Sequence, residues 1–318
     1  MRSTPSITAM RVAMRRAAHQ LYDSPLILND PVVLSILGTE RCDKLRSDPA
    51  RQSTPIAVAM RAYMAVRARF AEDCIAAAVA NGTTQLVILG AGLDTFAHRN
   101  PHPTLRVFEV DHPATQSWKL DMLAAAALPH PPNLRYAAVD FEARAASDSP
   151  ASLAPTASSN PEPAPQHDLR TALLAAGLDH TAKTFFSWMG VVPYLTLPAF
   201  RATLAFAASL PIGSGIAFDY GLPREHLSPR ARIGFDYLAS RVRRAGEPFQ
   251  LFFTPAEAAA ELRAAHYTRI QDLAPADLNA RYFTHNASEQ DSVKSSPLTL
   301  RPEAGHHIVC AWSCANGE

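Results

Sequence analysis

The chain has 318 residues, and its 30 Lys and Arg against 29 Asp and Glu leave a formal charge of +1 at pH 7, without a basic run that would hold nucleic acid. A hydrophobic fraction of 47% with 19% charged residues is typical of a globular protein and excludes a disordered chain. Because no apolar stretch is long enough to cross a bilayer and no signal-peptide pattern follows the first arginines, we expect a cytoplasmic protein that binds no membrane.

The first 80 residues contain no convincing strand and carry apolar residues at helical spacing, as in Met60, Tyr63 and Met64. We predict helices here that pack on one edge of a sheet and form an N-terminal helical cap over residues 1–81. Gly82 is suited to close the last of these helices, because glycine readily adopts the left-handed conformation that often follows a helix.

Residues 82–318 alternate short β-branched or aromatic runs with Ala- and Leu-rich segments, a pattern typical of a mainly parallel α/β sheet. The predicted strands are Gln85–Leu89, Leu105–Val110, Arg135–Val139, Thr184–Trp188, Gly215–Asp219, Tyr267–Asp272 and His306–Trp312. The predicted helices between them are Thr115–Ala127, Leu169–Ala176, Pro198–Ser209 and Pro255–Ala265. We therefore predict one α/β domain built on a seven-stranded, doubly wound, Rossmann-like sheet.

A segment rich in Ala, Ser and Pro interrupts this alternation at residues 143–167. Its prolines forbid a continuous helix or a central strand. We predict a disordered surface insertion, with an active-site lid as the alternative.

The first predicted strand runs directly into the turn Gly90-Ala91-Gly92, which the acidic Asp94 follows. Glycines allow a sharp turn and a close approach of the main chain to a ligand. Position 95 is Thr, so the third glycine of the GxGxxG dinucleotide motif is missing and a nicotinamide-type pyrophosphate site is disfavoured. The pattern favours a ligand without phosphates.

Acidic residues stand at the ends of the next two predicted strands. Glu109 and Asp111 project to the same side, and Asp111, nearer the crevice, is our candidate for hydrogen bonds to both hydroxyls of a ribose. Asp140 ends the third strand, where its carboxylate or the adjoining backbone can receive an adenine amino group beside Phe141; a helix cap or turn is the alternative role for Asp140. These strand ends together favour a nucleoside.

Six motifs carry a more specific signal. They are AVRARF (65–70), VILGAGLDT (87–95), FEVDHP (108–113) followed by Lys119, VDF (139–141), GVVPYLT (190–196) and DLNARYF (277–283). Over nearly the whole chain outside the insertion, the sequence resembles the leucine carboxyl methyltransferase-like branch of the class I S-adenosylmethionine-dependent methyltransferases. The combination of GAGLDT with EVDxP is the most specific part of this resemblance.

The resemblance implies that the cofactor is S-adenosyl-L-methionine. It implies that Arg67 binds the methionine carboxylate, that Gly90 lies beneath the cofactor and that Asp111 holds the ribose, while Asp140 and Phe141 frame the adenine. A guanidinium suits a carboxylate because it offers paired N–H donors in one plane, although from its pattern alone Arg67 would be a solvated helix residue. The remaining candidate cofactor-binding residues are Ala91, Gly92, Asp94, His112, Met189 and Gly190.

The turn after the fourth predicted strand departs from the family pattern. Relatives usually carry a glutamate that contacts the amino-acid end of the cofactor, whereas this chain has Met189. A thioether cannot accept a strong hydrogen bond from an ammonium group, so we expect weaker cofactor binding or a contact that moves to a neighbour. Tyr194 stands where the family has an acceptor-side tyrosine and is our catalytic candidate; a buried aromatic with a satisfied hydroxyl is the alternative.

We predict methyl transfer to an oxygen of a small-molecule acceptor. A carboxylate acceptor needs no general base, whereas a hydroxyl acceptor needs one, for which Tyr194 and His112 are candidates. A set of apolar residues in the N-terminal region either covers the acceptor or forms plain core: Met10, Met14, Tyr22, Met60 and Tyr63.

Two other functions compete with this prediction. A nicotinamide-dependent oxidoreductase shares the sheet topology but is disfavoured by the missing glycine. A cofactor-binding module without turnover would follow if Met189 abolished transfer. The twelve histidines form no metal-type pair, so we predict no metal, and the sequence indicates neither the acceptor nor the oligomeric state.

Overall fold

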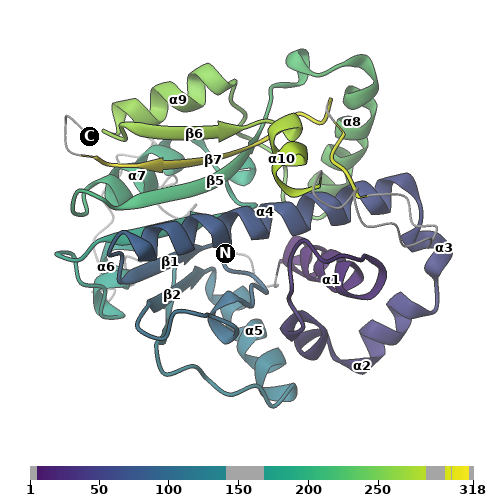
Figure 1. The fold of residues 1–318 in the computed structure, drawn as a ribbon, viewed down its shortest axis with the longest axis horizontal. Helices are drawn as coiled ribbons and strands as arrows, with labels where there is room; N and C mark the ends of the chain where they lie inside the picture. Colours follow the sequence, from purple (N-terminus) through teal and green to yellow (C-terminus); the bar gives the residue numbers. More distant parts are fainter. Residues whose placement is uncertain (1–5, 141–167, 284–297, 302, 315–318) are drawn as a thin grey trace, which may run out of the picture.

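The computed structural model describes residues 6–140, 168–283, 298–301 and 303–314, so the predicted insertion lies outside the described residues. The described residues form one seven-stranded sheet with the strand order β3-β2-β1-β4-β5-β7-β6. Neighbouring strands from β3 to β5 run parallel, and β7 is antiparallel to both β5 and β6. The fold is therefore the α/β Rossmann-like class that the sequence predicts (Figure 1).

The elements have the following bounds. The strands are β1 (Gln85–Leu89), β2 (Arg106–Asp111), β3 (Leu134–Ala138), β4 (Thr184–Trp188), β5 (Gly215–Gly221), β6 (Arg269–Leu273) and β7 (His306–Trp312). The α-helices are α1 (Ile7–Tyr22), α2 (Val32–Arg46), α3 (Pro49–Gln52), α4 (Pro55–Ala80), α5 (Pro113–Ala125), α6 (Leu169–Ala175), α7 (Leu197–Ala208), α8 (Pro229–Arg244), α9 (Pro255–Ala264) and α10 (Pro275–Tyr282). Short 3-10 helices are η1 (Phe96–His98), η2 (Val192–Tyr194) and η3 (Arg224–His226).

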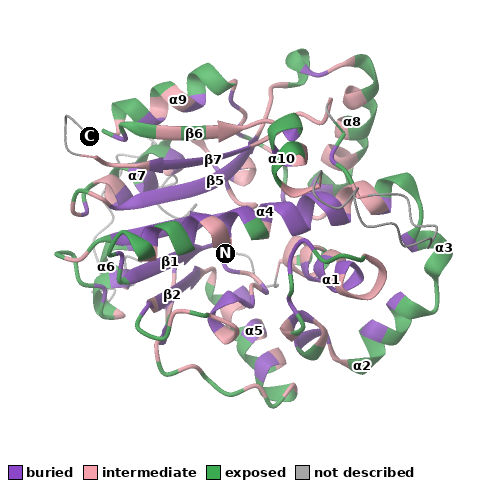
Figure 2. Cartoon of the chain, in the orientation of Figure 1, coloured by how far each residue is buried: buried purple, intermediate pink, exposed green. Residues whose placement is uncertain are grey.

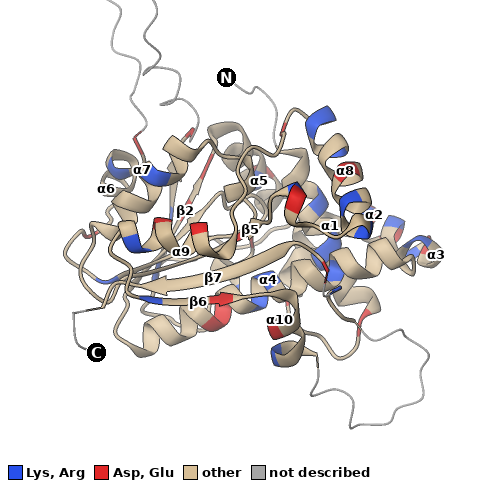
Figure 3. Cartoon of the chain, turned by 90° about the horizontal axis from the view of Figure 1, so that it is seen from above, with Lys and Arg blue, Asp and Glu red and all other residues tan. Residues whose placement is uncertain are grey.

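All seven predicted strands are confirmed. Those of β1, β4 and β7 agree at both ends, and the others differ from the structure by at most two residues. The sequence pattern missed α8 and α10. In α8 only Val242 is fully buried, so the helix lacks the wide apolar stripe that makes a helix visible in a sequence. Figure 3 shows Lys and Arg along the helices α8, α2 and α3.

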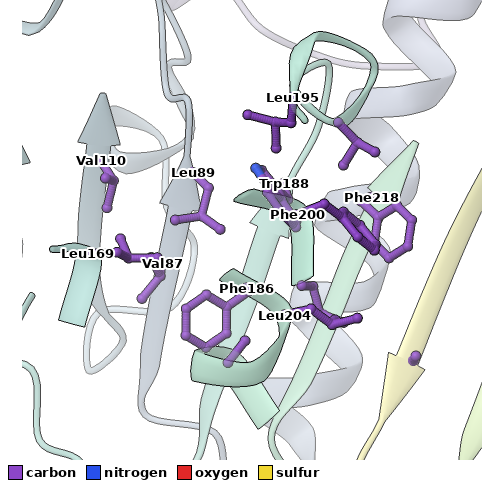
Figure 4. Close-up of a cluster of buried hydrophobic side chains, with 14 of the residues drawn as sticks. Val87, Leu89, Val110, Leu169, Phe186, Trp188, Leu195, Phe200, Leu204 and Phe218 are labelled. Atoms are coloured by element: carbon purple, nitrogen blue, oxygen red, sulfur yellow. The ribbon is translucent and has the colours of Figure 1, made fainter. Parts of the chain in front are cut away.

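Alternate residues of the central strands supply two apolar clusters, one on each face of the sheet. Val87 and Leu89 of β1 belong to the cluster that α6, α7 and α9 cover, where Trp188 stacks on Phe200 with ring centroids 5.4 Å apart (Figure 4). Leu86, from the same strand, belongs to the cluster on the opposite face. Figure 2 shows the resulting buried strands between more exposed helices. This period of two is what packed layers on both faces require.

The prediction that the N-terminal helices pack on one edge of the sheet is wrong for α4. Ala62, Val66 and Phe70 of α4 pack with Leu86 and Ile88 of β1, so α4 lies across a face of the central strands (Figure 1). The reason is that α4 has buried residues along nearly its whole length, which only a broad sheet face can cover.

The other N-terminal helices pack mainly on each other and on α4. Residues of α1 and α2 share a third apolar cluster with Leu93 and Leu123. Gly82 closes α4 as predicted, with φ of 86° and its N–H donating to the carbonyl of Val79 at 3.0 Å. Within the described residues, no helix combines the length and apolarity that a bilayer crossing needs. A cap boundary at residue 81 stays a prediction.

A buried ion pair fixes α5 against β2. The Lys119 ammonium donates to the Glu109 carboxylate, and the side chains are only 2% and 1% exposed. Burial raises the pKa of Glu109 to about 7, although the Lys119 charge acts in the opposite direction. Of the two candidate acids on β2, Glu109 is thus occupied by Lys119, which also explains the lysine that follows the FEVDHP motif.

Replacing one member of this pair should cost far more than replacing both. Glu109→Leu leaves the Lys119 ammonium buried without its partner, and we expect it to lower the free energy of unfolding by about 3–5 kcal/mol. The double variant Glu109→Leu/Lys119→Met leaves no buried charge and should lose clearly less. Urea denaturation of the three proteins checks this; equal losses in the single and double variants would contradict the role of the pair.

Candidate active site

A cleft of about 480 Å³ opens where β1, β2 and β4 end, and residues of α1 line its other side. This volume lies within the range of small-molecule sites. Strand β1 stands between β2 and β4, so the chain leaves the sheet centre in both directions here. Such a switch in strand order creates a crevice at the carboxyl edge of a parallel sheet, which is where open α/β folds bind ligands.

Of the twelve residues that the sequence predicts for the site, eleven line this one cleft, and Phe141 lies outside the described residues. The eleven are Arg67, Gly90, Ala91, Gly92, Asp94, Asp111, His112, Asp140, Met189, Gly190 and Tyr194. They come from α4, from the end of β2, from the turns after β1, β2 and β4 including η2, and from the segment after β3. The structure therefore brings these eleven residues together in one cleft.

The turn after β1 is locked onto the end of β2. The Gly92 N–H donates to Asp111 Oδ2 at 2.5 Å, and the His112 N–H donates to Oδ1 at 2.7 Å. Gly90 has φ of 64°, and a Cβ there would lie 2.3 Å from a methyl carbon of Val191. Only glycine fits this position, because a side chain would collide with the turn after β4.

Asp111 is half-buried and faces the cleft. Burial raises its pKa, and the two backbone N–H donors partly offset that effect. Each carboxylate oxygen accepts one backbone hydrogen bond and keeps a lone pair for a further donor. Beside it, His112 Nδ1 accepts the Ala114 N–H at 3.2 Å, which leaves Nε2 facing Asp140 Oδ2 at 3.8 Å. The ends of β2 and β3 thus join into one polar wall.

Arg67 reaches the cleft from α4 with its guanidinium held on two sides. Its Nη1 donates to Asp219 Oδ2 at 3.2 Å, and its charge lies 5.7 Å from the ring centroid of Tyr63. Burial alone would lower the pKa of Arg67, but the Asp219 carboxylate raises it above its usual value. One N–H contact to Asp219 leaves other guanidinium donors for the cleft.

Asp219 is the residue that the sequence analysis missed here. Its carboxylate also accepts the Tyr63 hydroxyl at 2.8 Å and the Gly190 N–H, so it joins α4 to the turn after β4. Gly190 has φ of 75°, and a Cβ on it would lie 2.7 Å from Arg67 Nη1. A signal existed: Asp219 is an acid flanked by apolar residues inside a strand, as Glu109 is in β2.

Asp94 connects the glycine turn to α1. Its Oδ1 accepts the Phe96 N–H at 2.7 Å, and its Oδ2 lies 3.4 Å from Arg16 Nη1. Arg16 is 4% exposed and also donates to Asp30 at 2.6 Å and to Thr95 at 2.8 Å. Burial would raise the pKa of Asp94, but the Arg16 charge holds it below its usual value. This network keeps α1 over the cleft.

A second polar group lies at the Tyr194 end of the cleft. The Thr8 hydroxyl of α1 donates to Glu247, and Thr8 also interacts with the Tyr194 hydroxyl. Burial and then the Glu247 charge raise the pKa of Tyr194 to about 12. No pattern in the sequence points to Glu247, which stands in the loop after α8, a helix that the periodicity missed.

Two predictions concern the apolar side of the cleft. Met189 lines it and packs against the cluster below α4, so no carboxylate replaces the family glutamate at that position. The five apolar N-terminal residues proposed to cover an acceptor do not line the cleft but pack in the core clusters, which confirms the plain-core alternative: Met10, Met14, Tyr22, Met60 and Tyr63.

Comparison with known proteins identifies the family of this chain. A family model described as leucine carboxyl methyltransferase matches residues 9–160 and 164–208. YktD of Bacillus subtilis (strain 168), named as an S-adenosyl-L-methionine-dependent methyltransferase, is 30% identical over 303 residues, which cover 88% of this chain and 92% of YktD. Proteins with the same naming from Saccharopolyspora erythraea and Mycolicibacterium gilvum are 31% and 32% identical over 67% and 69% of this chain and 66% of their own lengths.

The close approach of Arg67 to Gly190 can be tested with two matched substitutions. Gly190→Ala would push the guanidinium away and strain the backbone, so we expect S-adenosylhomocysteine to bind about tenfold more weakly or worse. Gly234→Ala in α8 meets no atom within 4 Å and should leave binding unchanged. Calorimetric titration measures both, and equal affinities for wild type and Gly190→Ala would contradict the assignment of Arg67 to the ligand.

Proposed function

The chain belongs to the leucine carboxyl methyltransferase family and is an S-adenosylmethionine-dependent methyltransferase, and from this premise we propose that it transfers the methyl group to an oxygen of a small-molecule carboxylate or hydroxyl. The observation that carries the proposal is that Arg67 and Asp111, from elements far apart in the sequence, line one cleft at the carboxyl edge of the sheet. Family membership favours this activity over nicotinamide-dependent oxidation.

The lining of the cleft fits the cofactor in shape and charge. Bare main chain at Gly90 and Gly92 forms the floor of the cleft. A Cβ at Gly90 would meet Val191, and a Cβ at Gly92 would meet Ala9. The acidic residues that line it outnumber the arginines, which suits a ligand with a sulfonium and an ammonium group and one carboxylate. The arginine that lies beside Gly190 is available for that one carboxylate.

We assign the residues as follows. Arg67 binds the carboxylate of the cofactor, because its unused N–H donors face the cleft and Asp219 holds the guanidinium in place. Asp111 accepts the ribose hydroxyls, and Asp140 with the adjoining backbone receives the adenine amino group. Met189 offers the ammonium group no strong acceptor, so that contact falls to neighbouring oxygens.

Catalysis then depends mainly on placement. When bound, the cofactor supplies a methyl carbon that is already electrophilic. Helix α1, fixed through Arg16, excludes water from one side of the cleft, which protects an acceptor held there. Tyr194 keeps its proton at neutral pH because its pKa is raised to about 12, so its hydroxyl can donate a hydrogen bond that orients the acceptor oxygen.

Transfer from methyl-labelled S-adenosylmethionine to a panel of carboxylates, phenols and alcohols tests the proposal. Mass spectrometry should find the label on oxygen in at least one product. Asp111→Asn removes a charged acceptor of the ribose hydroxyls and should weaken S-adenosylhomocysteine binding by about 10–100-fold. The exposed Asp121→Asn in α5 is the matched control and should bind as the wild type does. Label on nitrogen or carbon alone would overturn the proposal.

A further inference from the structure

We propose that the helices α1, α3 and α8 form a second binding site, outside the cofactor cleft, for the phosphate-type oxyanion of a small soluble molecule. The central residue of this site is Arg15 of α1, and the exposed Arg51 of α3 and Arg241 of α8 lie near it. None of the three lines the cleft, so the inference does not depend on the proposed function. Two observations lead to it: Arg15 has no partner, and the charges around it are positive.

Arg15 differs from the other arginines that are shielded from solvent. Within the ranges that the structure describes, the other buried or half-buried arginines each donate a hydrogen bond to a carboxylate or a main-chain carbonyl: Arg16, Arg61, Arg67, Arg99, Arg106 and Arg232. Arg15 is half-buried, and its side chain has neither a hydrogen bond nor an ion pair with any described residue. A guanidinium offers five N–H donors, and partial burial restricts the water molecules that could accept from them. Arg15 is therefore open to an anionic acceptor.

The charges that act on Arg15 are positive. Burial lowers the pKa of Arg15 most, and three neighbouring guanidinium groups lower it further: those of Arg61, Arg51 and Arg241. No carboxylate of the described residues is among the charges that shift this pKa. Like charges gathered in this way repel one another, and an anion bound between them would replace repulsion with attraction.

Hydrogen bonds of Arg61 hold α3 beside the end of α1. The Arg61 guanidinium donates to both oxygens of Asp23, the residue that follows α1, at 3.0 and 2.9 Å. It also donates to the carbonyl of Gln52, the neighbour of Arg51 in α3. The positive charge of Arg61 is thus paired, and its contacts bring the unpaired Arg51 toward α1.

Helix α8 approaches α1 from a distant part of the chain. The Thr8 hydroxyl in the first turn of α1 donates to Glu247, in the loop after α8, and Arg241 belongs to the last turn of α8 before that loop. Arg241 Nη1 donates to the Tyr237 hydroxyl at 3.3 Å, which leaves its other N–H groups for a ligand. Figures 1 and 3 place α1, α3 and α8 on the same side of the molecule.

The acids of this region are engaged elsewhere. Helices α1 and α3 contain no acidic residue, and the single acid of α8, Asp236, binds the exposed Arg224 with both oxygens at 2.8 Å. Asp23 holds Arg61, and Asp48 accepts the N–H of Arg51 as the cap of α3. The positive charge around Arg15 is therefore left for a ligand to neutralise.

A small anion with more than one negative charge suits this set best. Guanidinium groups bind phosphate oxygens through paired N–H donors, and three guanidinium groups without a carboxylate partner match a ligand of more than one charge. Because Arg15 is half-buried, the surface of another protein would meet the exposed Arg51 and Arg241 first, whereas a small ion can reach Arg15. We therefore favour a phosphate-type ion over an acidic polypeptide.

Calorimetric titration of the full chain with inorganic pyrophosphate tests the site. At neutral pH and low ionic strength, with S-adenosylhomocysteine present to occupy the cleft, we expect saturable binding to the wild type and none of acetate. Arg15→Met should weaken pyrophosphate binding by about tenfold or more. Arg135→Met, an exposed arginine of β3, removes the same charge elsewhere and should bind as the wild type does. No binding to the wild type, or equal affinity in Arg15→Met, overturns the proposal.

Melting temperatures supply a second readout, which a merely structural arginine would move in the opposite direction. In buffer without multivalent anions, Arg15→Met removes a repelling charge and keeps an apolar stem, so it should melt at the wild-type temperature or above it. Pyrophosphate should raise the melting temperature of the wild type and leave that of Arg15→Met unchanged. A clearly lower melting temperature of Arg15→Met in the same buffer would show that Arg15 has an internal partner, which contradicts the site.

A titration with a tetraglutamate peptide distinguishes the small ion from an acidic polypeptide. Weaker binding of the peptide than of pyrophosphate supports the proposal, and tighter binding of the peptide overturns it. Since the site and the cleft share no residue, neither result bears on methyl transfer.

Discussion

The buried ion pair between Arg67 and Asp219 is the interaction on which the site depends. It links α4 to β5 and, through the Gly190 N–H, to the turn after β4. Removing both charges from water is costly, and the cost is offset because Tyr63 and the backbone complete the hydrogen bonds of the carboxylate. In this setting the guanidinium keeps one orientation, with donors left for the cleft. The same closeness explains why position 190 is glycine.

The acidic residues and the arginines that line the cleft have different roles. Asp111 and Asp140, at the ends of β2 and β3, face the side of the cleft that we propose for the nucleoside, and two backbone donors fix Asp111. Arg16 uses its charge to hold α1 in place and does not offer it to a ligand. Because the methyl group of the cofactor is already electrophilic, the protein mainly has to position the acceptor and exclude water.

How far the sequence predicts the structure depends on how local the signal is. A strand that runs into the turn Gly90-Ala91-Gly92 and another that ends in Asp111 are short patterns with one physical meaning, and the structure places both in the cleft. Asp219 pairs with a residue 152 positions away, and no local pattern encodes such a contact. The position of Glu247 depends on α8, and the narrow apolar face of α8 leaves no periodic pattern by which the sequence would predict this helix. Spacing likewise showed that α4 is a helix, but only the distribution of buried residues shows that it crosses a sheet face.

The central claim is that Arg67 contacts the carboxylate of the cofactor and no other part of it. Calorimetry with S-adenosylhomocysteine and with 5′-methylthioadenosine, which lacks the amino acid, tests this directly in Arg67→Met, with Arg69→Met on the exposed side of α4 as the control. We predict that Arg67→Met weakens S-adenosylhomocysteine by about 100-fold and leaves methylthioadenosine within about twofold, while the control changes neither. Equal losses for both ligands in Arg67→Met would contradict the account.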